Sequence, residues 1–196
     1  MDIKIYNNII MVPVKCGTRY LDKIWEHQRI ELSHAQYLRF PKVKYMVIRD
    51  PMEHLITAIH TQTVKFINEF GKRDVFLESL NDFINPTGTT HWCVSFYEYL
   101  YYYRNKYGED VQIVKLENLT ELLKDLGFDI KYIPEEYHFK KYKDWMSKTE
   151  LFELLKNNYP NEINWLLDKV KTQNIYYNKL INNEIDISQQ GDKIML

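Results

Sequence analysis

Residues 8–25 read NIIMVPVKCGTRYLDKIW, and their pattern indicates how the chain folds. Residues 8–14 form a short apolar run rich in branched side chains, which is typical of a buried strand. A tight turn that contains Gly17 follows this run. Apolar side chains then recur at helical spacing, at Tyr20, Leu21, Ile24 and Trp25. The stretch therefore predicts a unit of strand, glycine turn and helix.

A second unit of the same kind begins at Tyr45–Ile48, which reads YMVI and predicts another buried strand. Arg49 follows at the end of this strand, and a helix is predicted directly after it. Asp50 is a typical N-cap residue, Pro51 suits the first helical turn, and Glu53 completes an Asp-x-x-Glu capping box.

Strands and helices continue to alternate along the chain, which favours a parallel sheet with helices on both faces. We therefore predict a single α/β domain over residues 1–196, built as three α/β/α layers around a mostly parallel sheet. The further elements that we predict are helices at Val75–Ile84, 92–107 and 120–126, a strand at 111–116, a helix capped by Ser147 and Glu150, a helix from about Pro160 to Lys171, and a loose tail from about residue 182.

Composition excludes several classes of function. The chain is 45% hydrophobic and 27% charged, which is the balance of a globular protein. Its net charge of −1 does not favour general binding to nucleic acid or to anionic membranes. We expect a cytoplasmic protein, because there are two cysteines, no signal-peptide pattern and no stretch of roughly 18 apolar residues. Scattered histidines and cysteines show no metal-ligand spacing, so no metal is expected.

The first unit has the features of an anion site. A helix that starts directly after a glycine turn offers unpaired backbone N–H groups and the positive end of its dipole. Gly17 permits a close backbone approach, Thr18 adds a hydroxyl group and Lys15 adds a cation. The loop is not a Walker A motif, because its lysine precedes the glycine. An ordinary tight turn with a surface lysine is the alternative interpretation.

The second unit adds a planar guanidinium group, Arg49, at a strand end, where it can bind a phosphate with two hydrogen bonds. Thr57 follows about two helical turns into the predicted helix. A helix cap beside a surface arginine would explain this pattern equally well. Ligands bind at the carboxyl ends of strands in such sheets, and both units place their polar residues there.

Taken together, the two units resemble the PAPS-dependent sulfotransferases, which use 3′-phosphoadenosine 5′-phosphosulfate (PAPS). The resemblance lies in the pattern K-[STC]-G-T after one strand and R-D-P-x-x-x-x-x-[ST] after another. Residues 111–119 and the pair His91-Trp92 resemble later segments of that family more weakly. The resemblance implies a P-loop NTPase-like sulfotransferase fold, an enzyme, PAPS as sulfuryl donor and PAP as its product.

The resemblance also implies which residues bind the nucleotide. Arg19 departs from the usual Ser or Thr, so it either adds a cation or points away, and His54 replaces a common arginine without consequence. Lys15, Gly17, Thr18 and Arg19 would surround the 5′-phosphosulfate, together with Cys16 and Tyr20 of the same loop, and Arg49 and Thr57 would bind the 3′-phosphate.

Sulfuryl transfer resembles phosphoryl transfer and needs a cation at the bridging oxygen and a base at the acceptor hydroxyl. We assign the first role to Lys15. His34 is our first choice as base, since Ser33-His34 stands where cytosolic sulfotransferases have a Thr-His pair, and His91 is the second choice. The other candidates are His27, His60, Glu26, Glu31 and Glu117, of which Glu117 is expected to have a structural role instead.

Two other classes of function stay open. One is a kinase of the P-loop type with a degenerate loop, which predicts a lysine after the glycine and a metal-binding aspartate. The other is a nucleotide-binding module without catalytic activity. For a sulfotransferase, a carbohydrate or small-molecule hydroxyl is the expected acceptor, with residues 68–91 at its rim. An aromatic helix at Tyr97–Arg104 is expected to belong to the core, although a sugar-stacking surface is the alternative.

Overall fold

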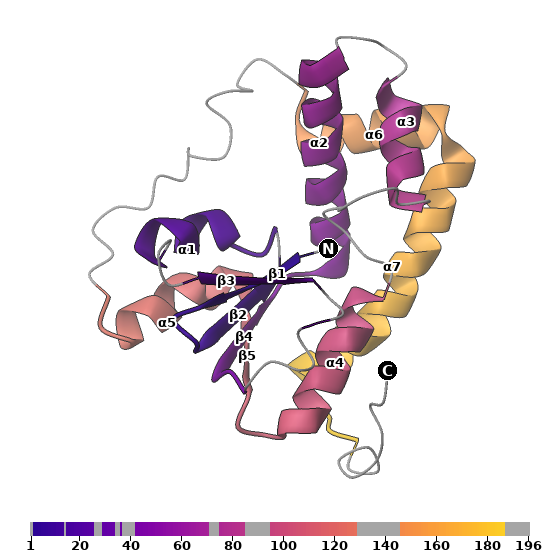
Figure 1. The fold of residues 1–196 in the computed structure, drawn as a ribbon. Helices are drawn as coiled ribbons and strands as arrows, with labels where there is room; N and C mark the ends of the chain where they lie inside the picture. The colour runs from indigo at the N-terminus through magenta and orange to yellow at the C-terminus, as the bar shows by residue number, and fades with distance from the viewer. Residues whose placement is uncertain are drawn as a thin grey trace.

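The chain folds around one five-stranded sheet, which Figure 1 shows as a ribbon. Helices lie between the strands and after them along the chain, and the strands form one sheet, so the predicted α/β class is confirmed. The structure is a computed structural model, and it describes residues 2–13, 15–25, 29–33, 36, 42–70, 75–84, 95–128 and 146–186.

The sheet is mixed rather than mostly parallel. Its strands are β1 (Asp2–Tyr6), β2 (Ile10–Pro13), β3 (Arg29–Ser33), β4 (Tyr45–Ile48) and β5 (Gln112–Lys115), in the order β3-β1-β2-β4-β5. β2 pairs with β4 and β4 pairs with β5 in parallel. β1, however, pairs antiparallel with both β2 and β3. The prediction of a mostly parallel sheet is therefore wrong.

The strand β1 causes this difference. Its sequence DIKIY alternates in polarity, and Ile3 and Ile5 are fully buried on one face. Asn7 and Asn8 follow with positive φ angles of 49° and 56°. Asparagine adopts this left-handed backbone more readily than most residues, so the chain can reverse directly into β2 as an antiparallel hairpin.

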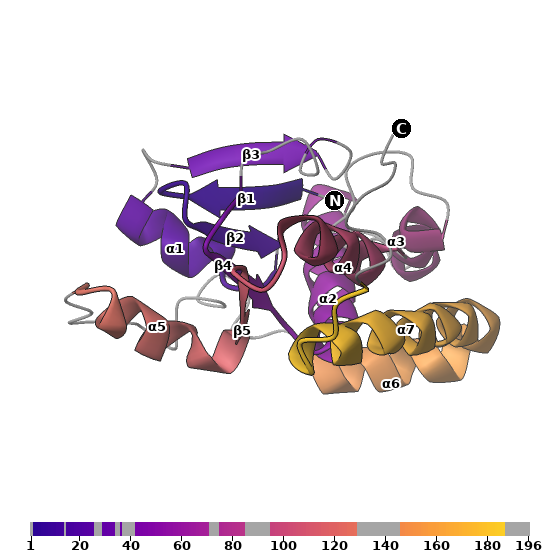
Figure 2. The same ribbon diagram turned by 90° about the horizontal axis from the view of Figure 1, so that it is seen from below.

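Helices cover both faces of the sheet, as Figure 2 shows. On one face, α1 (Thr18–Trp25) and α5 (Leu119–Asp125) pack against the side chains that β1, β2 and β4 direct to that face. On the other face lie α4 (Phe96–Tyr107) and the end of α7 (Pro160–Ile181), which pack against Ile3, Met11 and Met46. The three predicted layers are present, built on a mixed sheet.

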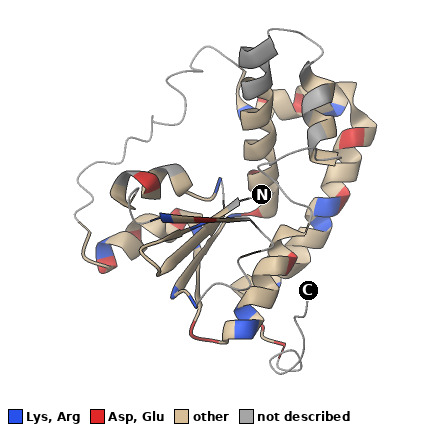
Figure 3. Cartoon of the chain, viewed as in Figure 1, with Lys and Arg blue, Asp and Glu red and all other residues tan. Residues whose placement is uncertain are grey.

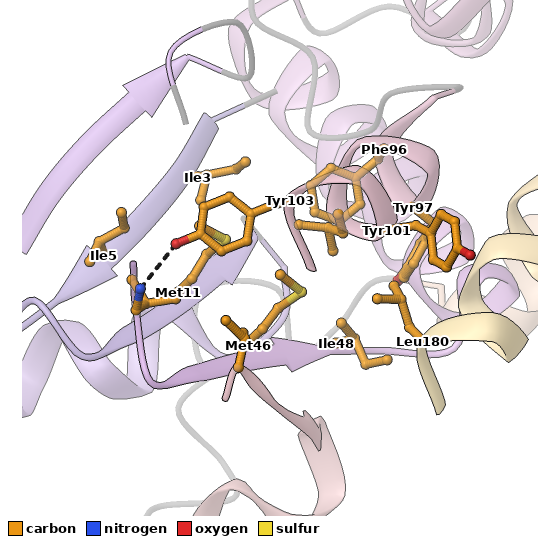
Figure 4. Close-up of a cluster of buried hydrophobic side chains, with 13 residues drawn as sticks. Ile3, Ile5, Met11, Met46, Ile48, Phe96, Tyr97, Tyr101, Tyr103 and Leu180 are labelled. Carbon is orange, nitrogen blue, oxygen red and sulfur yellow. Dashed lines mark hydrogen bonds between the residues drawn. The ribbon is translucent and has the colours of Figure 1, made fainter. Parts of the chain in front are cut away.

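The aromatic helix α4 belongs to the core, as expected. Tyr97, Tyr101 and Tyr103 are buried among aliphatic side chains of the sheet, and Figure 4 shows this cluster. The Tyr103 hydroxyl accepts a hydrogen bond of 3.0 Å from the backbone N–H of Val43, which satisfies a polar group inside the core. These tyrosines therefore serve packing rather than a sugar-stacking surface.

A second hydrophobic core lies beside the sheet. It is formed by α2 (Pro51–Phe70), α3 (Val75–Ile84), α6 (Lys148–Asn158) and the first part of α7. Leu55, Ile59, Leu155 and Leu166 are among its buried residues. In the part of the chain that the structure describes, no helix is both long and apolar enough to cross a membrane.

Helix α7 joins the two cores, and it is longer than the sequence predicts. We expected it to end near Lys171, but it continues to Ile181. Its first half buries Ile163 and Leu166 in the helical core, and its last turns pack Tyr177 and Leu180 on the sheet. Polar residues interrupt the apolar pattern midway, so contacts with α4 rather than periodicity determine where this helix ends.

A charged network attaches α1 to the sheet. The Tyr6 hydroxyl donates to the Thr18 carbonyl at 3.0 Å and to the Asp22 carboxylate at 2.7 Å. Lys4 and Arg29 pair with Asp22 at 3.2 and 2.9 Å. Burial raises the pKa of Asp22, but hydrogen bonds from Tyr6, Arg29 and Lys4 outweigh it and hold the pKa below its usual value.

Replacing Asp22 with asparagine is expected to lower the free energy of unfolding by about 1–2 kcal/mol at neutral pH. The stabilisation is present above the unfolded-state pKa of about 3.9, and it is lost as the pH falls through the lower folded-state pKa. Urea unfolding between pH 7 and pH 2 should show that the free energies of unfolding of the original protein and of Asp22→Asn become equal in acid. Asp168→Asn, in an exposed pair with Lys171, is the control and should cost nothing measurable. Equal losses in both variants would contradict this role of the network.

Candidate functional site

The two motifs singled out in the sequence lie side by side in the structure. β2 and β4 are neighbouring parallel strands, so their carboxyl ends meet at the same edge of the sheet. Lys15 follows β2, and Arg49 follows β4. The Arg49 Nη1 donates a hydrogen bond of 3.2 Å to the Lys15 carbonyl oxygen. This contact joins the two loops although 34 positions separate these residues in sequence.

The first loop has a backbone that few residues accommodate. Lys15 has φ 73° and Gly17 has φ 98°, both in the left-handed region. A Cβ atom built on Gly17 would lie 2.9 Å from side-chain carbons of both Leu116 and Leu119. Glycine is therefore favoured at position 17 by its φ angle, and a side chain there would also displace the ends of Leu116 and Leu119.

Cys16 lies inside this loop and has no exposed surface. Its backbone N–H donates to the Pro13 carbonyl at 3.0 Å, which closes the turn. Burial raises the pKa of the Cys16 thiol to about 12, although the charge of Arg49 acts in the opposite direction. The thiol therefore stays neutral and unreactive, and Cys16 supports the loop by packing.

Arg49 is held on several sides. Its Nη2 pairs with the Glu53 carboxylate at 3.3 Å, and its side chain is 18% exposed. Its own carbonyl oxygen accepts a hydrogen bond from the buried Tyr97 hydroxyl. Burial holds the pKa of Tyr97 well above its usual value, so this phenol stays protonated and can donate. The guanidinium group is thus held in place by contacts within the chain.

Asp50 caps helix α2, as predicted. Its Oδ1 accepts hydrogen bonds from the backbone N–H groups of Met52 at 2.9 Å and Glu53 at 3.0 Å. The Glu53 carboxylate, which we predicted to complete a capping box, pairs with Arg49 instead. The acidic partner of this arginine therefore comes from the first turn of the same helix.

Thr57 lies further along α2, and it brings a residue to the site that the sequence did not indicate. The Lys148 Nζ donates a hydrogen bond of 3.3 Å to the Thr57 hydroxyl. Lys148 is the first residue of α6, which the predicted capping box of Ser147 and Glu150 begins. Lys15, Arg49, Thr57 and Lys148 are referred to below as the strand-end cluster.

Tyr177 and Glu117 lie near the strand-end cluster. Tyr177, from α7, forms an edge-to-face contact with Tyr97 at 5.7 Å between ring centroids. Burial raises the pKa of Tyr177, and the charges of Asp50 and Glu117 raise it further. Glu117 is exposed in the short helix η3 (Leu116–Asn118), which follows the parallel strand β5. A third strand end thus contributes a carboxylate at this edge.

The other residues predicted to contact the nucleotide are Thr18, Arg19 and Tyr20, and the structure describes the side chains of two of them. Thr18 is buried at the start of α1. The Tyr20 ring packs against the core between α1 and α5, and burial raises the pKa of its phenol. The side chain of Arg19 lies outside the described residues, so its two interpretations stay as they were.

Of the candidates for the catalytic base, some lie within the described residues and others do not. His34 and His91, our two choices, lie outside the described residues, as do His27 and Glu26. Three further candidates are described, namely Glu31, His60 and Glu117.

Glu31 and His60 are engaged elsewhere. Glu31 pairs with Lys4 at 3.2 Å and with Arg29 at 3.0 Å. The buried His60 lies with Nε2 3.1 Å from the Met146 carbonyl, to which that nitrogen must donate. Burial lowers the pKa of His60, so its ring tends to be neutral. Glu117 differs from both, because it lies in η3 directly after the parallel strand β5 and forms no ion pair within the described residues.

Charge over the rest of the described chain is mixed. Figure 3 shows acidic and basic residues interspersed along the ribbon, in keeping with the net charge of −1. Attraction for an anion must therefore come from a local group such as the strand-end cluster. Within the described residues, no three His, Cys, Asp or Glu side chains gather in a way that could hold a metal ion.

The structure is that of an α/β protein with a five-stranded mixed sheet, in which Arg49 contacts the Lys15 backbone where two parallel strands end. Comparisons with protein-family models, with curated proteins and with solved structures found no match for this chain. The sequence motifs and the geometry of the cluster are therefore the grounds for a functional proposal.

Proposed function

We propose that this chain is a PAPS-dependent sulfotransferase that moves a sulfuryl group from PAPS to an acceptor hydroxyl. The observation that carries the proposal is the contact between the two motif loops, in which the Arg49 guanidinium donates to the Lys15 carbonyl at 3.2 Å. This contact places two patterns that are each ambiguous in sequence next to one another, which supports the proposal. A nucleotide with phosphates at both its 5′ and 3′ positions needs two such anion sites close together.

Each loop offers what one phosphate group requires. The turn at Gly17 leads into the N-terminus of α1, where the N–H groups that precede Tyr20 are the ones an anion could accept from, since the Tyr20 N–H already donates to the Gly17 carbonyl at 3.0 Å. It is suited to the 5′-phosphosulfate, with Lys15 as the cation. Arg49 and Thr57 supply a guanidinium fork and a hydroxyl on α2, which suit the 3′-phosphate.

In the proposed reaction, the acceptor oxygen attacks sulfur in line and forms a new S–O bond. The bond between sulfur and the bridging oxygen of the 5′-phosphate breaks, and PAP leaves with the electron pair. The Lys15 ammonium group stabilises the charge that develops on that oxygen. A base removes the acceptor proton, and His34 remains our first choice, with His91 second. Glu117 is the described candidate whose position at a strand end favours the same role.

The acceptor is proposed to be a carbohydrate or small-molecule hydroxyl, on the strength of the resemblance. Incubation with labelled PAPS and a panel of sugars, phenols and peptides would identify it. Transfer to sugars or phenols is the expected result. Transfer to a peptide and to no small hydroxyl would overturn this choice of acceptor without affecting the nucleotide site.

A P-loop kinase is less compatible with the geometry. Such an enzyme needs a carboxylate at a strand end that binds the metal of an ATP–magnesium complex. Asp50 occupies the strand end after β4, but its carboxylate accepts two backbone hydrogen bonds as the cap of α2. A nucleotide-binding module without catalysis remains the second alternative, and it differs from our proposal in turnover alone.

Ligand-dependent thermal stability tests the proposal directly. PAP should raise the melting temperature by several degrees at concentrations well above its dissociation constant, because it binds the folded state. ATP with magnesium, at the same concentrations, should have little effect. Stabilisation by ATP with magnesium and none by PAP would replace the sulfotransferase proposal with the kinase. Adenosine, which lacks both phosphates, is the control ligand.

A further inference from the structure

Arg49 and Glu53 form an ion pair at the position proposed for the 3′-phosphate. The Arg49 Nη2 lies 3.3 Å from the Glu53 Oε2, and the two residues are four positions apart around the start of α2. The Arg49 side chain is 18% exposed, whereas that of Glu53 is 59% exposed. A carboxylate therefore already engages part of the guanidinium group that a phosphate would need.

The two printed partners of the Arg49 guanidinium differ in how firmly they are held. Nη1 donates at 3.2 Å to the Lys15 carbonyl, a backbone atom of the turn that the hydrogen bond between the Cys16 N–H and the Pro13 carbonyl closes. That carbonyl cannot leave unless the turn itself moves. Glu53 reaches Arg49 with an exposed side chain, and exposed ion pairs contribute little net stability because water solvates both partners. Glu53 is thus the partner that an anion can displace.

The sequence offers Glu53 a second partner. Asp50 and Glu53 have the Asp-x-x-Glu spacing of a capping box, and the Asp50 carboxylate already accepts a hydrogen bond of 3.0 Å from the Glu53 N–H. In a complete capping box, the Glu53 carboxylate would accept a hydrogen bond from the backbone N–H of Asp50. A rotation of the Glu53 side chain from Arg49 to this N–H would release the guanidinium group and keep the carboxylate hydrogen-bonded.

Charge determines the direction of the effect on an anionic ligand. A phosphomonoester bound to Arg49 would lie beside the Glu53 carboxylate, and like charges at such short range repel one another. If Glu53 stays, the repulsion weakens binding. If Glu53 moves away, its ion pair with Arg49 is lost. Glu53 therefore lowers the affinity for the phosphate in either case.

We propose that Glu53 competes with a phosphomonoester group for the Arg49 guanidinium, and so limits how tightly that group binds. For the identity of the group, which would be the 3′-phosphate of PAPS and PAP, the inference rests on the proposed function. Donor and product both carry this phosphate, so the competition increases the rate at which PAP leaves after transfer. Glu53 itself takes no part in bond breaking.

The alternative role for Glu53 is to position Arg49 for the ligand. The two roles predict different changes when Glu53 is replaced with glutamine. Glutamine retains the size of the side chain and an oxygen that can accept a hydrogen bond from Nη2, but it has no charge. Loss of a competitor tightens phosphate binding. Loss of a positioning group weakens binding, or leaves it unchanged if the glutamine oxygen replaces the carboxylate.

The experiment is isothermal titration calorimetry with PAP, adenosine 5′-phosphate and inorganic phosphate as ligands. At low ionic strength, Glu53→Gln is expected to tighten PAP binding by about 3- to 10-fold. The gain should shrink at high salt, because the charge of an exposed carboxylate is then screened. Adenosine 5′-phosphate, which lacks the 3′-phosphate, should gain less. Glu153→Gln, at an exposed position on α6, is the matched control and should bind as the original protein does.

The outcomes separate this inference from the proposed function. If PAP binds Glu53→Gln no more tightly than the original protein, the inference is wrong and the sulfotransferase proposal stands. Weaker binding would assign Glu53 the positioning role. If PAP binds neither protein but inorganic phosphate binds Glu53→Gln more tightly, the inference stands and the nucleotide proposal falls. Failure of both ligands to bind either protein overturns both.

Discussion

Replacing Lys15 with alanine is expected to lower the rate constant for sulfuryl transfer by about 10²- to 10⁴-fold. A cation aimed at the bridging oxygen acts where negative charge develops, and removing one such group typically costs this much. The backbone should tolerate the change, because lysine and alanine both carry a Cβ atom at the positive φ of 73°. Single-turnover measurement of PAP release, with the acceptor that the panel identifies, gives the rate constant.

Two control measurements accompany the Lys15→Ala substitution, one of PAP affinity and one on a second lysine. PAP binding to Lys15→Ala should fall far less than the rate, since most of the nucleotide contacts remain. Lys124→Ala, at an exposed position on α5, should leave the rate unchanged. A rate for Lys15→Ala close to that of the original protein would exclude Lys15 from the chemistry. An equal loss of rate and PAP affinity would make it a binding residue.

Replacing Gly17 with alanine is expected to lower the free energy of unfolding by about 2–4 kcal/mol. Two costs add, because alanine is strained at φ 98° and its Cβ would lie 2.9 Å from carbons of Leu116 and Leu119. Leu119 is buried in the core that α1 covers, and the partly buried Leu116 packs against that core, so both have limited room to move. Urea unfolding followed by circular dichroism measures the change.

Gly127 provides a matched control for this prediction. It too has a positive φ, at 85°, but a Cβ built on it meets no atom within 4 Å. Gly127→Ala should therefore lose about 1 kcal/mol, the cost of backbone strain without overlap. The difference between the two variants measures the steric part. If both lose the same amount, the contact between Gly17 and the segment after β5 contributes nothing to stability.

Local sequence signals predicted the parts of the fold that carry the site. The strand Tyr45–Ile48 and the helix Val75–Ile84 have the predicted bounds. The Asp50 cap and the capping box of Ser147 are both present. Each of these signals acts within a few residues, through hydrogen bonds and apolar periodicity that neighbouring side chains determine.

The antiparallel strands β1 and β3 were not predicted from the sequence, and there is a physical reason. The strands β1 and β3 read DIKIY and RIELS, and each contains charged residues. Their charges are stabilised by partners elsewhere, since Lys4 and Arg29 pair with Asp22 of α1. Such pairs form after the chain has folded, so the sequence window around each strand does not contain them.

Sequence and tertiary structure therefore contribute differently to the candidate site. The residue types and spacing around Gly17 and Arg49 predicted a glycine turn and a capped helix start, because glycine geometry and helix capping are local properties. Pairing of parallel strands decided that the two turns meet, and packing of α6 on α2 brought Lys148 within hydrogen-bond distance of Thr57. These contacts depend on burial of side chains that are distant in sequence, and such burial is a property of the folded chain as a whole.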